Sequence, residues 1–145
     1  MRIVTVVALA ALAGTAFAAG QITIKDSSYR TLAYVDDDGA VKDRSYRTLG
    51  YVGDDGTIKD GSYRTLGYFD GETVKDGSYR TLGYYDGGTL KDSSYRTIAY
   101  VADGAIKFSS YRTYGYYEAD DVPFKNVDAY VVAWAFFFSD LLETD

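Results

Sequence analysis

The chain has 145 residues with no Cys and no His, and its formal net charge at pH 7 is −6. Without Cys it can form neither disulfides nor thiol nucleophiles, and without His it lacks the commonest general base and transition-metal ligand. The excess of acidic residues argues against a nucleic-acid partner, because such proteins neutralise phosphates with a basic face.

The first 18 residues have the pattern of a secretory signal peptide. Arg2 gives a positive start, residues 3–12 form an apolar stretch, and Ala16-Phe17-Ala18 supplies small residues at a cleavage site. An uncleaved membrane anchor is the alternative, since the apolar run is nearly long enough to span a bilayer. We expect cleavage after Ala18, no stable transmembrane span after cleavage, and export to the periplasm, the cell surface or the exterior.

A tandem repeat follows the signal peptide. The tetrapeptide Ser-Tyr-Arg-Thr occurs six times, with its Tyr at positions 29, 46, 63, 79, 95 and 111, so the spacing is 16 or 17 residues. Each unit opens with an apolar residue followed by Lys; the apolar residues are Ile24, Val41, Ile58, Val74, Leu90 and Ile106. We assign residues 19–126 to a domain of six β-hairpin units and residues 127–145 to an apolar segment that packs on it.

Each unit contains two turn signals. The first is Asp60-Gly61 and its counterparts, where Asp-Gly predicts a type I′ turn. The second is Asp38-Gly39 and its counterparts, and in the sixth unit it becomes the stretch from Glu118 to Pro123. Two turns per unit leave strands of about four to six residues.

The longer strand of a unit is expected to run from Tyr63 to Phe69, with its odd-numbered residues on one face and its even-numbered residues on the other. A small residue stands at its middle in every unit: Ala33, Gly50, Gly67, Gly83, Ala99 and Gly115. Small residues inside strands mark close backbone approach or a bulge, and six of them in register indicate six strands that converge near a common axis. A lone hairpin of this size is not stable, so the units must pack together.

The C-terminal segment breaks the repeat. Residues 129–138 are ten consecutive apolar residues, too few to span a bilayer and typical of a buried core segment. Asn126 is a candidate N-cap for a helix with Asp128 in its first turn, whereas Val131, Val132 and the three consecutive Phe favour a strand. Both a short helix and a strand stay open.

The run from Asp55 to Tyr68, with the ending Trp134-Ala-Phe-Phe-Phe138, resembles the β-flower proteins, small exported bacterial proteins described as four-fold or five-fold β-flowers. The resemblance covers residues 21–138. It implies hairpins that radiate around a pseudo-symmetry axis, and it implies no particular activity. The six units and the acidic residues Asp140 and Glu143 depart from the family, so closure with five-fold or six-fold pseudo-symmetry stays open.

The sequence therefore predicts an all-β fold of tandem hairpins in a closed radial arrangement, with the C-terminal segment packed on it. A β-solenoid with one unit per coil is the alternative. Calcium binding by the Asp-rich turns is a second possibility for those residues, but we interpret them as ordinary hairpin turns, since no Glu follows at the spacing of an EF-hand.

The repeated Tyr-Arg pairs are the candidate ligand surface: Tyr29, Arg30, Tyr46, Arg47, Tyr63, Arg64, Tyr79, Arg80, Tyr95, Arg96, Tyr111 and Arg112. They could bind a glycan with avidity, but a pair that recurs in every unit is better interpreted as architectural, with Tyr packed between units and Arg paired with the Asp of its own turn. Phe108 stands where the other units have that Asp, so it removes this partner from Arg112.

We expect no enzyme and no cofactor, because each Asp of the repeat is explained by a turn and no carboxylate pair has a glycosidase signature. The hypothesis is an exported, noncatalytic structural or binding module with an unknown partner. A self-assembling surface or extracellular subunit and a multivalent carbohydrate-binding module are the alternatives. The region between Phe108 and Asp128, where the repeat is least regular, is where a separate site would be expected.

Overall fold

The computed structural model describes residues 20–120 and 127–143, which form twelve strands, one α-helix and one 3₁₀ helix. The strands are β1 (Gln21–Asp26), β2 (Thr31–Asp36), β3 (Ala40–Asp43), β4 (Thr48–Val52), β5 (Thr57–Asp60), β6 (Thr65–Phe69), β7 (Thr73–Asp76), β8 (Thr81–Asp86), β9 (Thr89–Asp92), β10 (Thr97–Ala102), β11 (Ala105–Phe108) and β12 (Thr113–Ala119). Each strand pairs antiparallel with its sequence neighbours, and β1 pairs with β12, so the sheet closes into a barrel. The expected closed arrangement of hairpins is confirmed, and the β-solenoid is wrong because the sheet closes on itself.

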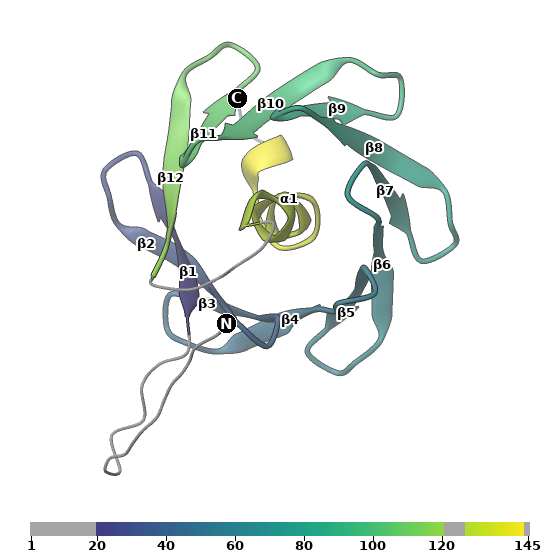
Figure 1. Cartoon of the computed structure of the whole chain (residues 1–145), viewed down its shortest axis with the longest axis horizontal. Helices are drawn as coiled ribbons and strands as arrows, with labels where there is room; N and C mark the ends of the chain where they lie inside the picture. Colours follow the sequence, from purple (N-terminus) through teal and green to yellow (C-terminus); the bar gives the residue numbers. More distant parts are fainter. Residues whose placement is uncertain (1–19, 121–126, 144–145) are drawn as a thin grey trace.

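Six hairpins make up the ring, as Figure 1 shows in the view down the barrel axis. The closure is therefore six-fold in this chain. The expected second turn of the sixth unit does not begin at Glu118, because Glu118 and Ala119 pair with Thr23 and Ile22 of β1. The rest of that predicted turn, from residue 121, lies outside the described residues. The strand that was expected to turn away instead forms the seam that completes the barrel.

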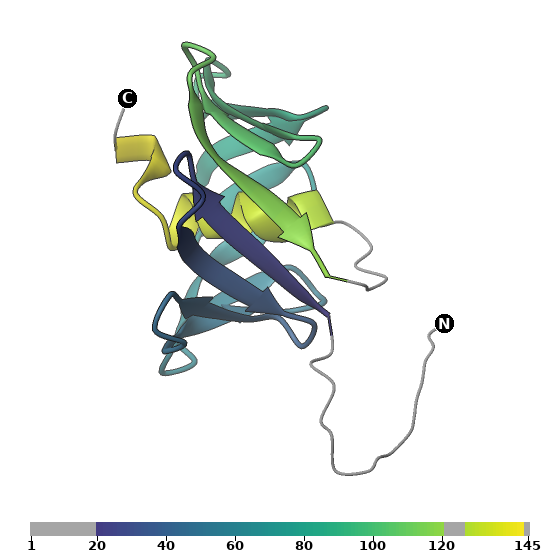
Figure 2. The ribbon, with the colours of Figure 1, turned by 90° about the vertical axis from the view of Figure 1, so that its left-hand side faces the viewer.

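The axis of the barrel holds the helix α1 (Val127–Phe137), which the 3₁₀ helix η2 (Leu141–Glu143) follows. Figures 1 and 2 show α1 surrounded by the strands. Five consecutive residues, 131–135, are buried, which requires a helix that is apolar on all sides and explains its composition. The expectation of a packed helix or strand is confirmed as a helix; the proposed N-cap, Asn126, lies outside the described residues. Neither helix in the described part of the chain is long and apolar enough to cross a membrane.

The inner wall consists of the apolar residue that opens each repeat unit and of the small residue of each long strand. Ile24, Val41, Ile58, Val74, Leu90 and Ile106 are all fully buried. A Cβ added to Gly67 would lie 2.2 Å from the carbonyl oxygen of Lys75 and 2.6 Å from Cζ of Phe137. Gly83 and Gly50 would meet Phe136 and Phe138 in the same way. The small residues do face the axis, but the strands do not converge there, because α1 lies between them.

The long strands are shorter and less regular than expected. β6 begins at Thr65, so Tyr63 and Arg64 belong to the preceding turn. Opposite β5, Ile58 pairs with Gly67 but Lys59 pairs with Thr65, which leaves Leu66 as the extra residue of a β-bulge. The expected strict alternation over residues 63–69 is wrong for this reason. Equivalent register shifts occur in all six long strands.

Candidate functional site

The turn that carries Tyr and Arg is built around the side chain of an Asp. In the third unit, Oδ1 of Asp60 accepts hydrogen bonds from the backbone amides of Ser62 and Arg64, at 2.8 and 3.0 Å. Its carbonyl oxygen accepts from the amide of Tyr63 at 3.0 Å. These amide contacts, above all that of Arg64, hold the pKa of Asp60 below its ordinary value. Asp is therefore required here as an acceptor that satisfies otherwise unpaired turn amides.

The left-handed position of this turn is held by tyrosine. The backbone φ of Tyr63 is 68°, and the equivalent Tyr of all six units lies between 68° and 72°. The sequence predicted a type I′ turn with its positive φ at Asp60-Gly61, but Gly61 is not among the residues with positive φ. The predicted type I′ geometry occurs instead at a second turn, where Asp103 and Gly104 have φ of 54° and 82°.

Each turn tyrosine contacts a tyrosine of the neighbouring long strand. The pairs are Tyr29–Tyr116, Tyr46–Tyr34, Tyr63–Tyr51, Tyr79–Tyr68, Tyr95–Tyr84 and Tyr111–Tyr100, with ring centroids 4.5–5.1 Å apart. We call these twelve residues the tyrosine belt. The pair Tyr29–Tyr116 joins the first hairpin to the last, so a tyrosine pair lies at every junction between hairpins. The expectation that Tyr packs between units agrees with these contacts.

A lysine lies over each turn tyrosine. The distance from Nζ to the ring centroid ranges from 3.9 Å for Lys91 and Tyr95 to 5.8 Å for Lys59 and Tyr63. These are cation–π distances. A hydrogen bond between the hydroxyls of Tyr51 and Tyr63 raises the pKa of Tyr51. Every unit therefore repeats one cluster of two phenol rings and an ammonium group.

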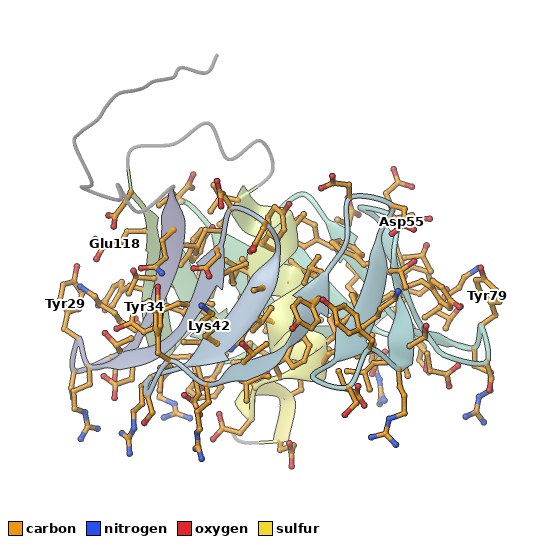
Figure 3. All side chains as sticks on the ribbon, turned by 90° about the horizontal axis from the view of Figure 1, so that it is seen from below. Tyr29, Tyr34, Lys42, Asp55, Tyr79 and Glu118 are labelled. Carbon is orange, nitrogen blue, oxygen red and sulfur yellow. The ribbon has the colours of Figure 1, made fainter. Side chains whose placement is uncertain are left out.

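The turn tyrosines are nevertheless exposed, with fractional exposures between 51% and 65%. Figure 3 shows Tyr29 and Tyr79 at opposite flanks of the barrel, with their rings on the outer wall. Large aromatic side chains at this exposure leave much of their ring surface available to a ligand. The belt thus carries six exposed turn tyrosines, of which Tyr63 and Tyr79 stack on their strand tyrosine and the other four meet it edge to face.

The arginine next to each turn tyrosine lies at the edge of the barrel and not on its wall. Nε of Arg64 donates to Oδ2 of Asp60 at 2.9 Å, and Arg80 and Asp76 are joined in the same way at 2.9 Å. The expected pairing of Arg with the Asp of its own turn is therefore present in these units, and also in those of Arg30, Arg47 and Arg96. We call Arg30, Arg47, Arg64, Arg80, Arg96 and Arg112 the arginine crown. Because the strands alternate in direction, all six belong to turns at one edge of the barrel.

The sixth unit replaces this ion pair with an aromatic contact. Phe108 is 9% exposed, and the guanidinium carbon of Arg112 lies 4.6 Å from its ring centroid. Phe108 also contacts Tyr114, whose hydroxyl donates to Asp140 at 2.6 Å beyond the end of α1. Burial raises the pKa of Tyr114 well above its usual range, and the hydrogen bond to Asp140 adds to the effect. Phe108 and Tyr114 of the irregular unit therefore hold the C-terminal segment by packing. Residues 121–126 of the region between Phe108 and Asp128 lie outside the described residues.

The opposite edge of the barrel is acidic. It comprises the turns that follow β2, β4, β6, β8 and β10 and the end of β12, with Asp36, Asp37, Asp38, Asp54, Asp55, Asp70, Glu72, Asp86, Asp103, Glu118 and Asp120. We call this set the acidic edge. Lysines of the wall pair with three of its members, Asp36, Asp86 and Glu118, at 3.1, 3.8 and 2.8 Å. Within residues 20–120 and 127–143 no three carboxylates are grouped so that they could hold a metal ion.

The start of α1 lies beside a cavity at the acidic edge. The cavity has a volume of about 810 Å³ and is lined by the β4–β5 and β6–β7 turns with Tyr85, Asp128 and Tyr130. Asp128 accepts hydrogen bonds from Tyr117 at 2.6 Å and from Tyr85 at 3.4 Å. Burial raises the pKa of Tyr85 to about 12, and the Asp128 carboxylate adds to the effect. These contacts fix the start of the helix to two strands.

The structure separates the residues that the sequence placed together. In each Tyr-Arg pair, Tyr joins the belt on the wall while Arg joins the crown at one edge. The strand tyrosines and the lysines were not among the predicted site residues, although both recur at fixed positions in every unit. Their regular recurrence was the signal that could have identified them.

The comparisons with known proteins point to one family. The model of the family described as "5-fold beta-flower protein" matches residues 21–139, which covers most of the chain. The matched region contains all six hairpins and the whole of α1. No curated protein and no solved structure matches the chain.

Proposed function

The chain belongs to the 5-fold beta-flower family, and from this premise and the tyrosine belt we propose that it is an exported, noncatalytic module that binds a carbohydrate polymer. The observation that carries the proposal is the repetition of one exposed cluster, a turn tyrosine backed by a strand tyrosine and a lysine, around a closed wall. The phenol rings offer flat apolar surfaces to the C–H faces of sugars, while the hydroxyls and ammonium groups offer hydrogen bonds.

The backbone conformation supports a role for these rings beyond filling space. A non-glycine residue in the left-handed region costs about 1–2 kcal/mol, and six tyrosines occupy it here. The contacts with a strand tyrosine and a lysine offset part of this cost, yet more than half of each turn tyrosine faces solvent. The rings are therefore held outward by a rigid turn that fixes their direction.

The barrel also determines how such sites would act together. A polymer has many copies of the same sugar, and a ring of six such clusters can engage several at once. Binding through several weak sites exceeds the affinity of each by about 10²–10⁴ when the geometry allows simultaneous contact. We expect weak binding of short oligosaccharides and much stronger binding of polymers.

The experiment is a pull-down of the full chain, processed by the host that expresses it, on insoluble cellulose, chitin and peptidoglycan. We expect retention on at least one of them, and a fall of about 10²-fold in apparent affinity when Tyr63, Tyr79 and Tyr95 are all changed to Gly. The matched variant with Phe at the same three positions keeps the rings and should retain most of the binding. No retention of the wild-type protein on any of the three polymers would contradict the proposal.

A further inference from the structure

The two edges of the barrel differ in the charge that they present to solvent. At one edge the arginine crown projects from the six turns that follow the odd-numbered strands. At the other edge eleven carboxylates follow the even-numbered strands. Figure 3 shows this division, with Asp55 and Glu118 at one edge and nitrogen-tipped side chains extending from the other. The difference follows from the antiparallel topology, which sends successive turns to alternate edges.

In five turns of the crown edge the arginine is paired with an Asp but is much more exposed than that partner. The Arg side chains of the five paired turns are 77–81% exposed, whereas the carboxylates of their Asp partners are only 20–24% exposed. The carboxylates are turned toward the backbone amides that they cap. In each of these turns Nε donates to the carboxylate at 2.9–3.0 Å, which fixes the guanidinium plane. The guanidinium groups are therefore preorganised for a second carboxylate.

The acidic edge and the crown share the hairpin repeat of the barrel. Both edges are formed by the ends of the same twelve strands, so they have the same periodicity around the axis. Many of its carboxylates are exposed, including Asp37, Asp54 and Asp55. A second copy of the chain moved along the barrel axis would place its crown against this ring of carboxylates.

We propose that copies of this protein associate head to tail along the barrel axis, with the arginine crown of one copy against the acidic edge of the next. The contact is heterologous, because two different surfaces of the chain meet, so each copy leaves one edge open for a further copy. Bidentate contacts between guanidinium and carboxylate supply the specificity, and the exposed guanidinium groups of one edge attract the exposed carboxylates of the other. The proposal is independent of the tyrosine belt, which lies on the wall and stays accessible in such a stack.

The first experiment is sedimentation velocity of the full chain, processed by its expression host, over a range of concentrations in 50 mM and 500 mM NaCl. We expect association that grows with concentration at the lower salt and weakens at least about tenfold at the higher salt, because exposed charges are screened. The double variant Arg64→Glu and Arg80→Glu should stay monomeric. The matched control, Lys59→Glu and Lys75→Glu, makes the same change in net charge in the same units but on the wall, and it should associate like the wild type.

A charge exchange provides the decisive test. The variant Asp37→Lys and Asp54→Lys reverses charge at the acidic edge and should also stay monomeric alone. Mixed with Arg64→Glu and Arg80→Glu, it should restore association, because each reversed edge then meets the complementary edge of the other variant. Circular dichroism of each variant establishes that it is folded before it is mixed.

Three results would overturn the proposal. A wild-type protein that stays monomeric at 50 mM NaCl at every concentration would do so, as would a wall control that loses association as completely as the crown variant. The third is crown-dependent binding to vesicles with anionic headgroups without any self-association, which would assign the arginine crown to a lipid surface instead.

Discussion

The residues of each Ser-Tyr-Arg-Thr segment, and the Asp before it, have different structural roles. The Asp that precedes it caps the turn amides, the Tyr takes the left-handed position and projects onto the wall, and the Arg extends from the edge. These separate roles explain why the tetrapeptide recurs unchanged. A substitution in it would alter either the turn or the residues exposed on the wall and the edge. At this scale the sequence predicted the pairing of Arg with Asp but not the backbone of Tyr, since left-handed tyrosine contradicts the preference of that position for Gly.

Two substitutions of a turn tyrosine distinguish the cost of its left-handed backbone from the contribution of its ring contact. Tyr63→Gly should change the free energy of unfolding by less than about 1 kcal/mol, because relief of the left-handed backbone offsets the lost contact with Tyr51. Tyr63→Ala loses the same ring but keeps the strain, so it should be less stable than the Gly variant by about 1 kcal/mol. Urea denaturation of the two variants measures the difference. Equal stability of the two would contradict the backbone argument.

The turn carboxylates predict loss of stability in acid. Hydrogen bonds from turn amides lower the pKa of Asp26, Asp43, Asp60, Asp76 and Asp92 below the ordinary 3.8. A lowered folded-state pKa contributes stability that is present above the unfolded value and is lost as pH falls through the folded value. The melting temperature should therefore decrease as the pH is lowered below about 4. Asp60→Asn, which keeps the amide acceptor, should reduce the size of that fall.

At the scale of elements, three consecutive aromatic residues at the C-terminal end of α1 contact three different strands. Phe136, Phe137 and Phe138 lie against the glycines of β8, β6 and β4. The sequence showed both the small residues and the Phe run, and it correctly predicted the burial of the C-terminal segment. It did not show that the Phe residues face the small residues of the long strands, because that contact depends on the rotation of α1 within the barrel. The small residue of each long strand indicated either close approach or a bulge, but the pattern did not show that the residue before it, such as Leu66, would be the extra one.

Adding one methyl group tests this contact. Gly67→Ala should destabilise the protein by about 1–3 kcal/mol, because its Cβ would lie 2.2 Å from a backbone oxygen and 2.6 Å from Phe137. Gly61→Ala is the matched control, since its Cβ would lie 3.5 Å from the nearest atom, and it should change stability by no more than about 0.5 kcal/mol. Thermal unfolding compares them. Equal melting temperatures for both variants would show that the neighbouring backbone and Phe137 can shift to accommodate a methyl group at Gly67.

The whole molecule is a closed ring of strands whose interior is filled by α1, a segment that is not part of the repeat. Tandem hairpins and a closed arrangement could be predicted, because short strands with two turns per unit cannot be stable alone. Six-fold closure could not, since it depends on the pairing of β1 with β12, which are far apart in sequence and carry no local signal for each other. The separation of belt, crown and acidic edge also appears only at this scale, because it follows from strand direction.

Removing the helix should abolish the barrel. A chain that ends at Asp120 keeps all twelve strands but loses the buried residues of α1, including Trp134 at 3% exposure. We expect no cooperative thermal transition, because the inner wall would face an empty space. Trp134→Ala gives a graded comparison and should lower the free energy of unfolding by about 3–5 kcal/mol. A truncated chain that melts cooperatively at the wild-type temperature would contradict this prediction.

The position of α1 in the sequence also determines when folding can finish. The helix is encoded after the last strand, so a chain emerging from the ribosome presents all the strands before the segment that fills their centre. No part of the chain that ends before α1 can complete the core, because Val131 to Ala135 fill its centre. The native state therefore depends on a segment that follows all twelve strands in the sequence.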